Sequence, residues 1–267
     1  MNAYLTSLMA VVTREALRFV QQRERFVAAL VRPLVWLIVF AAGFRAALGL
    51  SITPPYQTYI TYEVYIVPGL CGMIMLFNGM QSSLSLVYDR EMGSMRLLLT
   101  SPMPRWWLLF SKLLGSTAIS ILQVYVFLLI AGLYGLINGI GMPAWGYVAV
   151  FPALVVCGVM LGALGLFLSS FIKQLENFAG VMNFVIFPMF FLSSALYPLW
   201  KMAENAPFLA KICAVNPFTH AVELIRFSLY LHWDGMTTLW SVLAAVVFVG
   251  LAVWGYDPAR GSKGKGL

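Results

Sequence analysis

Long apolar runs separated by short polar segments set the expected architecture of this chain. A hydrocarbon core of about 30 Å needs roughly 20 helical residues to cross it, and six runs approach or exceed that length. The predicted spans cover about residues 34–50, 64–86, 113–137, 145–171, 178–198 and 239–256. The pattern therefore predicts an all-α polytopic membrane protein with six transmembrane helices.

The first 30 residues have a different pattern, in which apolar and basic positions alternate at helical spacing. The expected apolar face contains Leu8, Val12, Ala16, Phe19 and Phe26, and the polar face contains Arg14, Arg18, Arg23 and Arg25. A basic amphipathic helix of this kind is typical of the membrane interface. We expect an interfacial helix over residues 1–30, a membrane domain over 31–256 and a basic tail over 257–267.

Four amide side chains fall inside the predicted spans, where each needs a hydrogen-bonding partner. They are Asn78, Gln81, Gln123 and Asn183. Two interpretations remain open from the sequence: bonding between helices, or lining of a translocation path. Arg45 lies near the end of the first span and also allows two interpretations. Its side chain can extend outward to the membrane interface, or its charge can have a functional role inside the membrane.

Glycine and proline give further expectations about the spans. Gly158 and Gly162 in the fourth span predict close helix packing, which is a structural signal and not a chemical one. Pro68 with Gly69 predicts a kink in the second span, and Pro188 predicts a break or kink in the fifth.

The stretch from residue 87 to 104 is the most charged part of the chain. It carries Asp89, Arg90, Glu91 and Arg96, although only 10% of the chain is charged. After Gly93 it predicts a short amphipathic helix, which Pro102 ends. Such a helix suits docking to a partner in the water phase, and spacing alone does not distinguish this from a solvated loop.

Residues 199–238 are too polar to span a membrane and too apolar to form a free loop. They hold both histidines, and we expect short helices partly embedded at the membrane surface. Glu223 and Arg226 are three residues apart, so they can pair on one helix face, with local stability as the simplest role.

The amino-acid composition adds information mainly through the distribution of charge, which predicts the orientation in the membrane. The chain is 61% hydrophobic, above the usual roughly 45–50%, and its net charge is +7. If the N-terminus is cytoplasmic, 13 of the 17 Lys and Arg residues, Arg32 included, fall in inside segments. This bias predicts both termini and the 87–104 stretch in the cytoplasm, and it explains the basic charge without nucleic acid.

The sequence offers little catalytic chemistry. Both histidines lie outside the spans, which argues against haem ligation. The spans contain no carboxylate cluster for a metal, and the chain has no P-loop for ATP. We therefore expect a non-enzymatic membrane protein with no cofactor of its own.

Two motifs make the chain resemble the ABC-2-type permease family, the type V exporters. Residues 89–94 and 97–102, DREMGS and LLLTSP, look like that family's ER(E)xGTxxxLLxSP stretch, with Ser94 in place of the usual Thr. Residues 216–226, from Asn216 to Arg226, are similar to its NPxTxxxExxR segment. The amphipathic start and the six predicted spans also fit the family, so the likeness covers nearly the whole chain.

The resemblance implies a permease that dimerises and binds two copies of a separate ATP-binding cassette subunit, which holds ATP and Mg. The coupling residues would be Asp89, Arg90, Glu91, Gly93, Ser94, Arg96, Leu98, Leu99, Ser101 and Pro102. A re-entrant outer segment would contain Asn216, Pro217, His220, Glu223 and Arg226. The cargo would be apolar or amphipathic, such as a drug, a lipid or a lipid-linked glycan. The location would be a prokaryotic inner membrane.

A non-transporting assembly factor or an intramembrane enzyme is the alternative that the residues leave open. Such a protein would need no cassette partner.

Overall fold

The computed structural model describes residues 3–21, 23–44, 55–56, 60–91, 104–137, 142–172 and 174–255. Every regular element in this part of the chain is an α-helix, which confirms the expected all-α class. The helices are α1 (Ala3–Gln21), α2 (Arg23–Phe44), α3 (Tyr62–Glu91), α5 (Arg105–Ile137), α6 (Gly146–Phe171), α7 (Leu175–Phe191), α8 (Leu199–Asn205), α9 (Pro207–Val215), α10 (Pro217–Leu229) and α11 (Gly235–Gly255).

Four helices are long and apolar enough to cross a membrane, namely α3, α5, α6 and α11. Helices α9 and α10 are bent by 77° at a short break and together form either a fifth span or a re-entrant pair. Of the shorter apolar helices, Leu175–Phe191 covers most of the predicted fifth span, whereas Phe26–Val39 begins eight residues before the predicted first span and overlaps it only at residues 34–39. The described chain thus supports a multi-pass membrane protein with four or five candidate spans, and the count of six stays a prediction.

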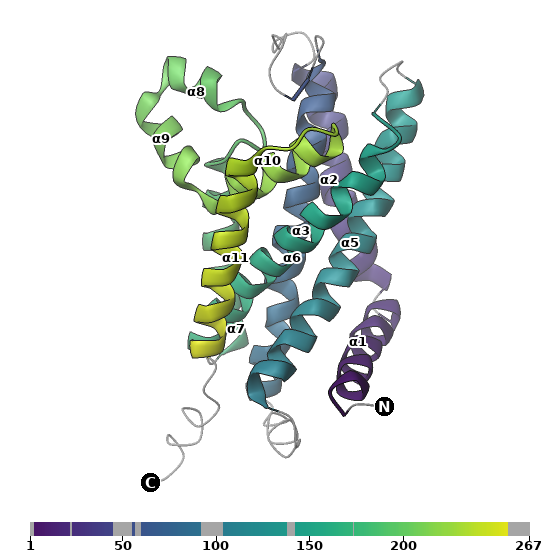
Figure 1. Ribbon diagram of the computed structural model, residues 1–267, viewed down its shortest axis with the longest axis vertical. Helices are drawn as coiled ribbons and strands as arrows, with labels where there is room; N and C mark the ends of the chain where they lie inside the picture. Colours follow the sequence, from purple (N-terminus) through teal and green to yellow (C-terminus); the bar gives the residue numbers. More distant parts are fainter. Residues whose placement is uncertain are drawn as a thin grey trace.

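Helix α3 lies at the centre of the arrangement. It packs against α2, α5, α6, α7 and α10, whereas α11 packs mainly on α6 and α10. In its most apolar stretch 94% of α3 is buried, against 17% for α11. Helices α8 to α10 lie at one end of the bundle, and α1 and the C-terminal end of α11 lie at the other (Figure 1).

Glycines let α6 approach the central helix closely. An added Cβ on Gly79 of α3 would lie 2.9 Å from the backbone of Leu161 and Gly162, and one on Gly165 would lie 2.7 Å from the Gly79 carbonyl oxygen. Gly158 faces the Thr117 side chain of α5 in the same way, at 2.6 Å. The predicted packing role of the fourth-span glycines is confirmed.

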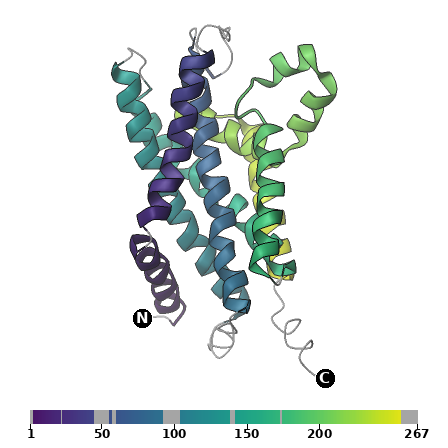
Figure 2. The ribbon, with the colours of Figure 1, turned by 180° about the vertical axis from the view of Figure 1, so that it is seen from behind.

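The N-terminal region differs from the expected single amphipathic helix. The structure has two helices, with α1 ending at Gln21 and α2 running from Arg23 through Pro33. Figure 2 shows that α1 turns away from the axis of α2. The reason is that α1 packs on α5, where Glu15 is buried against Gly115 while Ala16, expected on the apolar face, is exposed.

The predicted fifth span also differs, because α7 continues through Pro188 and ends at Phe191 instead of reaching residue 198. Residues 192–198 form turns, and we call them the 192–198 turn. The second span is a continuous helix through Pro68, and it is longer than predicted at both ends. At Gly69 the missing side chain leaves room for the backbone of Ala195 in the 192–198 turn.

The contact between α3 and α6 gives a direct test of the packing. Gly79→Ala forces the two helices apart, so we expect a loss of about 1–3 kcal/mol in stability. The matched control is Gly180→Ala on α7, where an added Cβ meets nothing within 4 Å. The control is expected to be neutral or slightly stabilising, because alanine favours helix over glycine. Unfolding of the purified variants measures both, and equal stability of the two would contradict this packing.

Candidate functional site

A buried charged group, Arg226 of α10, lies beside the N-terminal end of α3 and is only 2% exposed. Its Nη1 donates to the carboxylate of Glu223, and its Nη2 donates to the Ser194 carbonyl oxygen at 3.0 Å. The guanidinium also lies over the Tyr65 ring, 4.0 Å from its centroid. Arg226 therefore joins α10, the 192–198 turn and α3, and we call this group the outer clamp, after the predicted outer segment that contains Arg226.

Two tyrosines of α3 hold the same turn. The hydroxyl of Tyr62 donates to the Leu196 carbonyl oxygen at 3.0 Å, and that of Tyr65 donates to Ser194 at 2.9 Å. Their backbone acceptors are in a non-helical segment, so these bonds replace those that a helix would provide. The turn is thus fixed to α3 by side chains rather than by regular structure.

Tyr56, in the segment before α3, completes this end. It is 6% exposed and packs edge-on against Tyr230, with 4.6 Å between ring centroids. Burial raises the pKa of Tyr56 to about 12, although the nearby Arg226 charge opposes the rise. Burial thus strengthens the preference for the neutral hydroxyl, the form that tyrosine already has at neutral pH.

Asn216 links two helix ends with one side chain. Its Nδ2 donates to the Met189 and Leu192 carbonyl oxygens at 2.8 and 2.6 Å, where α7 ends. Its Oδ1 accepts from the Phe218 N–H at 3.0 Å, as the N-cap of α10. Both helix ends would otherwise leave polar groups without partners, which explains an Asn at this position.

The remaining residues of the predicted outer segment make contacts that stabilise the fold. Pro217 is the first residue of α10, where its missing N–H is tolerated. His220 stacks on Trp240 of α11 with ring centroids 5.9 Å apart. The predicted Glu223–Arg226 pair is confirmed, and the short helices expected over 199–238 are present as α8, α9 and α10.

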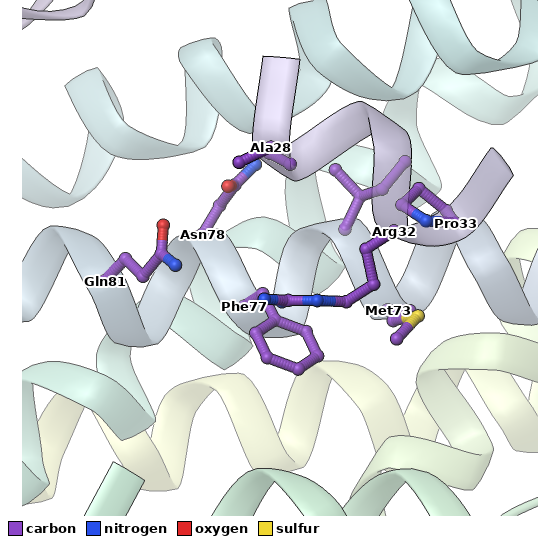
Figure 3. A pocket seen from close by; sticks show the side chains of 9 residues that line it. Ala28, Arg32, Pro33, Met73, Phe77, Asn78 and Gln81 are labelled. Carbon is purple, nitrogen blue, oxygen red and sulfur yellow. The ribbon is translucent and has the colours of Figure 1, made fainter. Parts of the chain in front are cut away.

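A second site lies between α2 and α3, in a pocket with a volume of about 50 Å³. Figure 3 shows Arg32 extending from α2 with its guanidinium over Phe77, while Asn78 and Gln81 project from the same region of α3. The guanidinium carbon is 3.9 Å from the ring centroid of Phe77. The other lining residues are Ala28, Ala29, Pro33, Met73 and Ile74. We call this the α2–α3 pocket.

The four predicted path residues do not all meet. Asn78 and Gln81 share the α2–α3 pocket, and the Asn78 Nδ2 donates to Gln123 of α5. Asn183 is exposed on α7 and does not line this pocket. The Asn78–Gln123 bond supports a packing role for those two amides, and whether any of the four touches cargo stays a prediction.

Arg32 is the site residue that the sequence analysis missed. It was counted among the cytoplasmic charges, because it precedes Pro33 and the first long apolar run. Since α2 begins at Arg23, Arg32 instead lies within a helix that packs along α3. One signal in the sequence could have placed it there. No turn-forming residue lies between Arg23 and Arg32, so a helix that includes the apolar run after Pro33 can begin well before Arg32.

The charged end of α3 is only partly visible. The Oε2 of Glu91 accepts from the backbone N–H of Leu175 at 3.1 Å, at the start of α7. The side chains of Asp89 and Arg90 lie outside the described residues. So do all atoms of the other predicted coupling residues, which are Gly93, Ser94, Arg96, Leu98, Leu99, Ser101 and Pro102. Arg45 and the tail over 257–267 lie outside as well.

Nothing in the described ranges gathers three His, Cys, Asp or Glu side chains in a way that could hold a metal ion. The α2–α3 pocket offers hydrogen-bond donors and the exposed cation of Arg32 beside apolar side chains. Such groups can bind and orient a molecule, and they provide no nucleophile with an adjacent base.

The outer clamp predicts a large loss of stability when its charge is removed. Arg226→Ala leaves the carboxylate of Glu223 without its cationic partner and removes one of the two donors to the Ser194 carbonyl oxygen, so we expect a loss of about 3–5 kcal/mol. Lys211→Ala, at an exposed position of α9, is the control and should change little. Thermal unfolding of the purified chain measures both, and an unchanged transition for Arg226→Ala would show that the clamp contributes nothing.

The bond between Asn78 and Gln123 can be tested by a double-mutant cycle. We expect Asn78→Leu and Gln123→Leu to be coupled by about 0.5–2 kcal/mol, because each single change leaves an amide without its partner. Stability is measured for both single variants and the double variant. Strictly additive losses would mean that the two amides act independently.

Comparison with known proteins agrees with this geometry. The model of the ABC-2 type transporter family matches residues 6–230. Two similar proteins are named transport permease ycf38: that of Cyanophora paradoxa is 29% identical over 233 residues, 86% of this chain and 76% of that protein. That of Porphyra purpurea is 28% identical over 254 residues, 94% of this chain and 80% of its own. The multidrug ABC transporter permease YbhR of Escherichia coli is 28% identical over 209 residues, 74% of this chain and 53% of that protein. The chain belongs to the ABC-2 type transporter family.

Proposed function

We propose that this chain is the permease subunit of an ATP-binding cassette exporter, which moves an apolar or amphipathic cargo across a prokaryotic inner membrane. A separate cassette subunit hydrolyses the ATP, and the chain itself catalyses no reaction. Membership in a transporter family favours this function over an assembly factor or an intramembrane enzyme. The relative named as a multidrug permease makes drug-like amphiphiles reasonable candidates for the cargo.

The observation that carries the proposal is the continuity of α3. This helix runs unbroken from the outer clamp at Tyr62 and Tyr65 to Glu91, where the charged stretch begins. A rigid helix of this kind can carry a displacement at one end to the other. A cassette that docks on residues 89–102 would therefore act on the outer clamp through α3.

We further propose two cassettes on a permease homodimer, with both termini in the cytoplasm. Helix α1 and the C-terminal end of α11 lie at the same end of the bundle as the C-terminal end of α3, as this topology requires (Figure 1). The excess of Lys and Arg in the segments at that end supports the orientation.

The position of Glu91 refines its proposed role. Its carboxylate accepts the Leu175 N–H, so loss of Glu91 can weaken the α3–α7 connection as well as cassette docking. Glu91→Gln separates the two roles, because the amide oxygen still accepts a hydrogen bond while the charge is lost.

We expect Glu91→Gln and Arg96→Ala to lower cassette co-purification and ATPase activity by about tenfold or more, since breaking one partner of an interfacial charge pair costs about 2–5 kcal/mol. Glu176→Gln is the matched control, an exposed carboxylate in the first turn of α7. The measurement is a pull-down of the tagged chain from gently solubilised membranes, followed by an ATPase assay. Recovery of the chain without a cassette protein would contradict the permease function, and full activity of both variants would contradict the coupling assignment.

A further inference from the structure

The charge of Arg32 lies deep along the central helix. The apolar stretch of α3 from Tyr62 to Tyr88 has 27 residues, about 40 Å at 1.5 Å per residue. Phe77, whose ring contacts the guanidinium, stands within about 3 Å of the midpoint of that stretch. A cation at such depth in a membrane protein is rare, and it marks ion or substrate sites more often than packing.

The described residues provide no carboxylate for this cation. The ion pairs in this part of the chain are Arg14 with Glu15 and Arg226 with Glu223. Arg32 has the Phe77 ring, which attracts the guanidinium but leaves its N–H groups free to donate to a ligand. Arg226, by contrast, is paired and almost fully buried, whereas Arg32 is exposed where the α2–α3 pocket opens.

Gln81 adds a second set of donors to the same pocket. Its amide makes no hydrogen bond to any described residue, in contrast to Asn78, which is bonded to Gln123. The rest of the wall is apolar, with Ile74 and Met73 from α3 and Ala28 from α2. A charged donor and an amide donor beside apolar walls match a molecule with an anionic group and a hydrocarbon part.

We propose that the α2–α3 pocket binds the anionic headgroup of an amphiphile, a phosphate or a carboxylate, with Arg32 and Gln81 as donors. The hydrocarbon part lies along the apolar faces of α2 and α3 at the open side of the pocket. This proposal rests on the proposed transport function. It narrows the class of molecule that the pocket binds, whether transported cargo or a resident lipid, to anionic amphiphiles.

The first test uses the full chain in phosphatidylcholine nanodiscs with three photoreactive probes. Each probe carries a diazirine in a dodecyl chain, and the headgroups are phosphate, maltoside and trimethylammonium. Dodecyl phosphate is expected to label peptides that contain residues 28–33 and 73–81 in preference to the other two probes. Equal labelling by the maltoside probe would overturn the proposal.

Variants identify the donors. Arg32→Gln should weaken dodecyl phosphate binding by about tenfold or more, because it removes a charge-assisted hydrogen bond, and Arg32→Lys should retain part of it. Gln81→Leu should weaken binding by a smaller factor, and it keeps the test decisive if Arg32→Gln does not fold. Arg14→Gln, at an exposed arginine of α1, is the control and should bind normally. Unchanged binding in folded Arg32→Gln would overturn the assignment.

The source of the anionic group is distinguished in proteoliposomes that contain the chain and its cassette. If cargo occupies the pocket, ATP moves dodecyl phosphate between leaflets, and Arg32→Gln slows this transfer. If a resident lipid occupies it, phosphatidylglycerol raises ATPase activity in the parent but not in Arg32→Gln, and the probe is not moved. Binding to the isolated chain does not require a cassette, so failure of the cassette pull-down and failure of this proposal are separate results.

Discussion

Polar groups that leave water inside a membrane protein must find partners within the protein, and α3 is where most of the structure meets this constraint. Five helices cover it, and its glycines let the backbones of α6 and of the 192–198 turn come close. Polar side chains connect α3 to other segments at three levels, the outer clamp, the α2–α3 pocket and the Glu91 end. Each level connects α3 to a different neighbour, so displacement of α3 would disturb all of them together.

The three levels differ in whether their charged groups have a partner of opposite charge. At the outer clamp, Arg226 has a carboxylate, a backbone carbonyl and an aromatic ring. At the middle level, Asn78 is bonded to Gln123, while the described residues give Arg32 only the Phe77 ring. The Arg226 charge is therefore paired and buried, which suits stability, although its Nε and the hydroxyls of Ser194 and Tyr230 have no hydrogen-bond partner among the described residues. In the pocket the Arg32 cation has no carboxylate among the described residues, and this difference in charge pairing is the reason for proposing ligand binding at the pocket alone.

Several elements followed from the sequence because their signals are local. The fourth span was predicted within one residue of α6, since its apolar run is bounded by a turn and a polar loop. The Glu223–Arg226 pair followed from helical spacing. The break after Gln21 and the end of α7 at Phe191 did not, because α1 packs on α5 and Asn216 caps α7 from a distant segment.

The sequence by itself determined the class of the molecule, its family and most of its polar site residues, with Arg32 as the exception, because hydropathy and short motifs are properties of neighbouring positions. Only the tertiary structure decided which of those residues meet. It paired Asn78 with Gln123, left Asn183 apart and placed Arg32 beside the middle of α3. The physical reason is that helix packing brings together residues from separate segments, and their contacts depend on the rotation and depth of each helix, which no local pattern specifies.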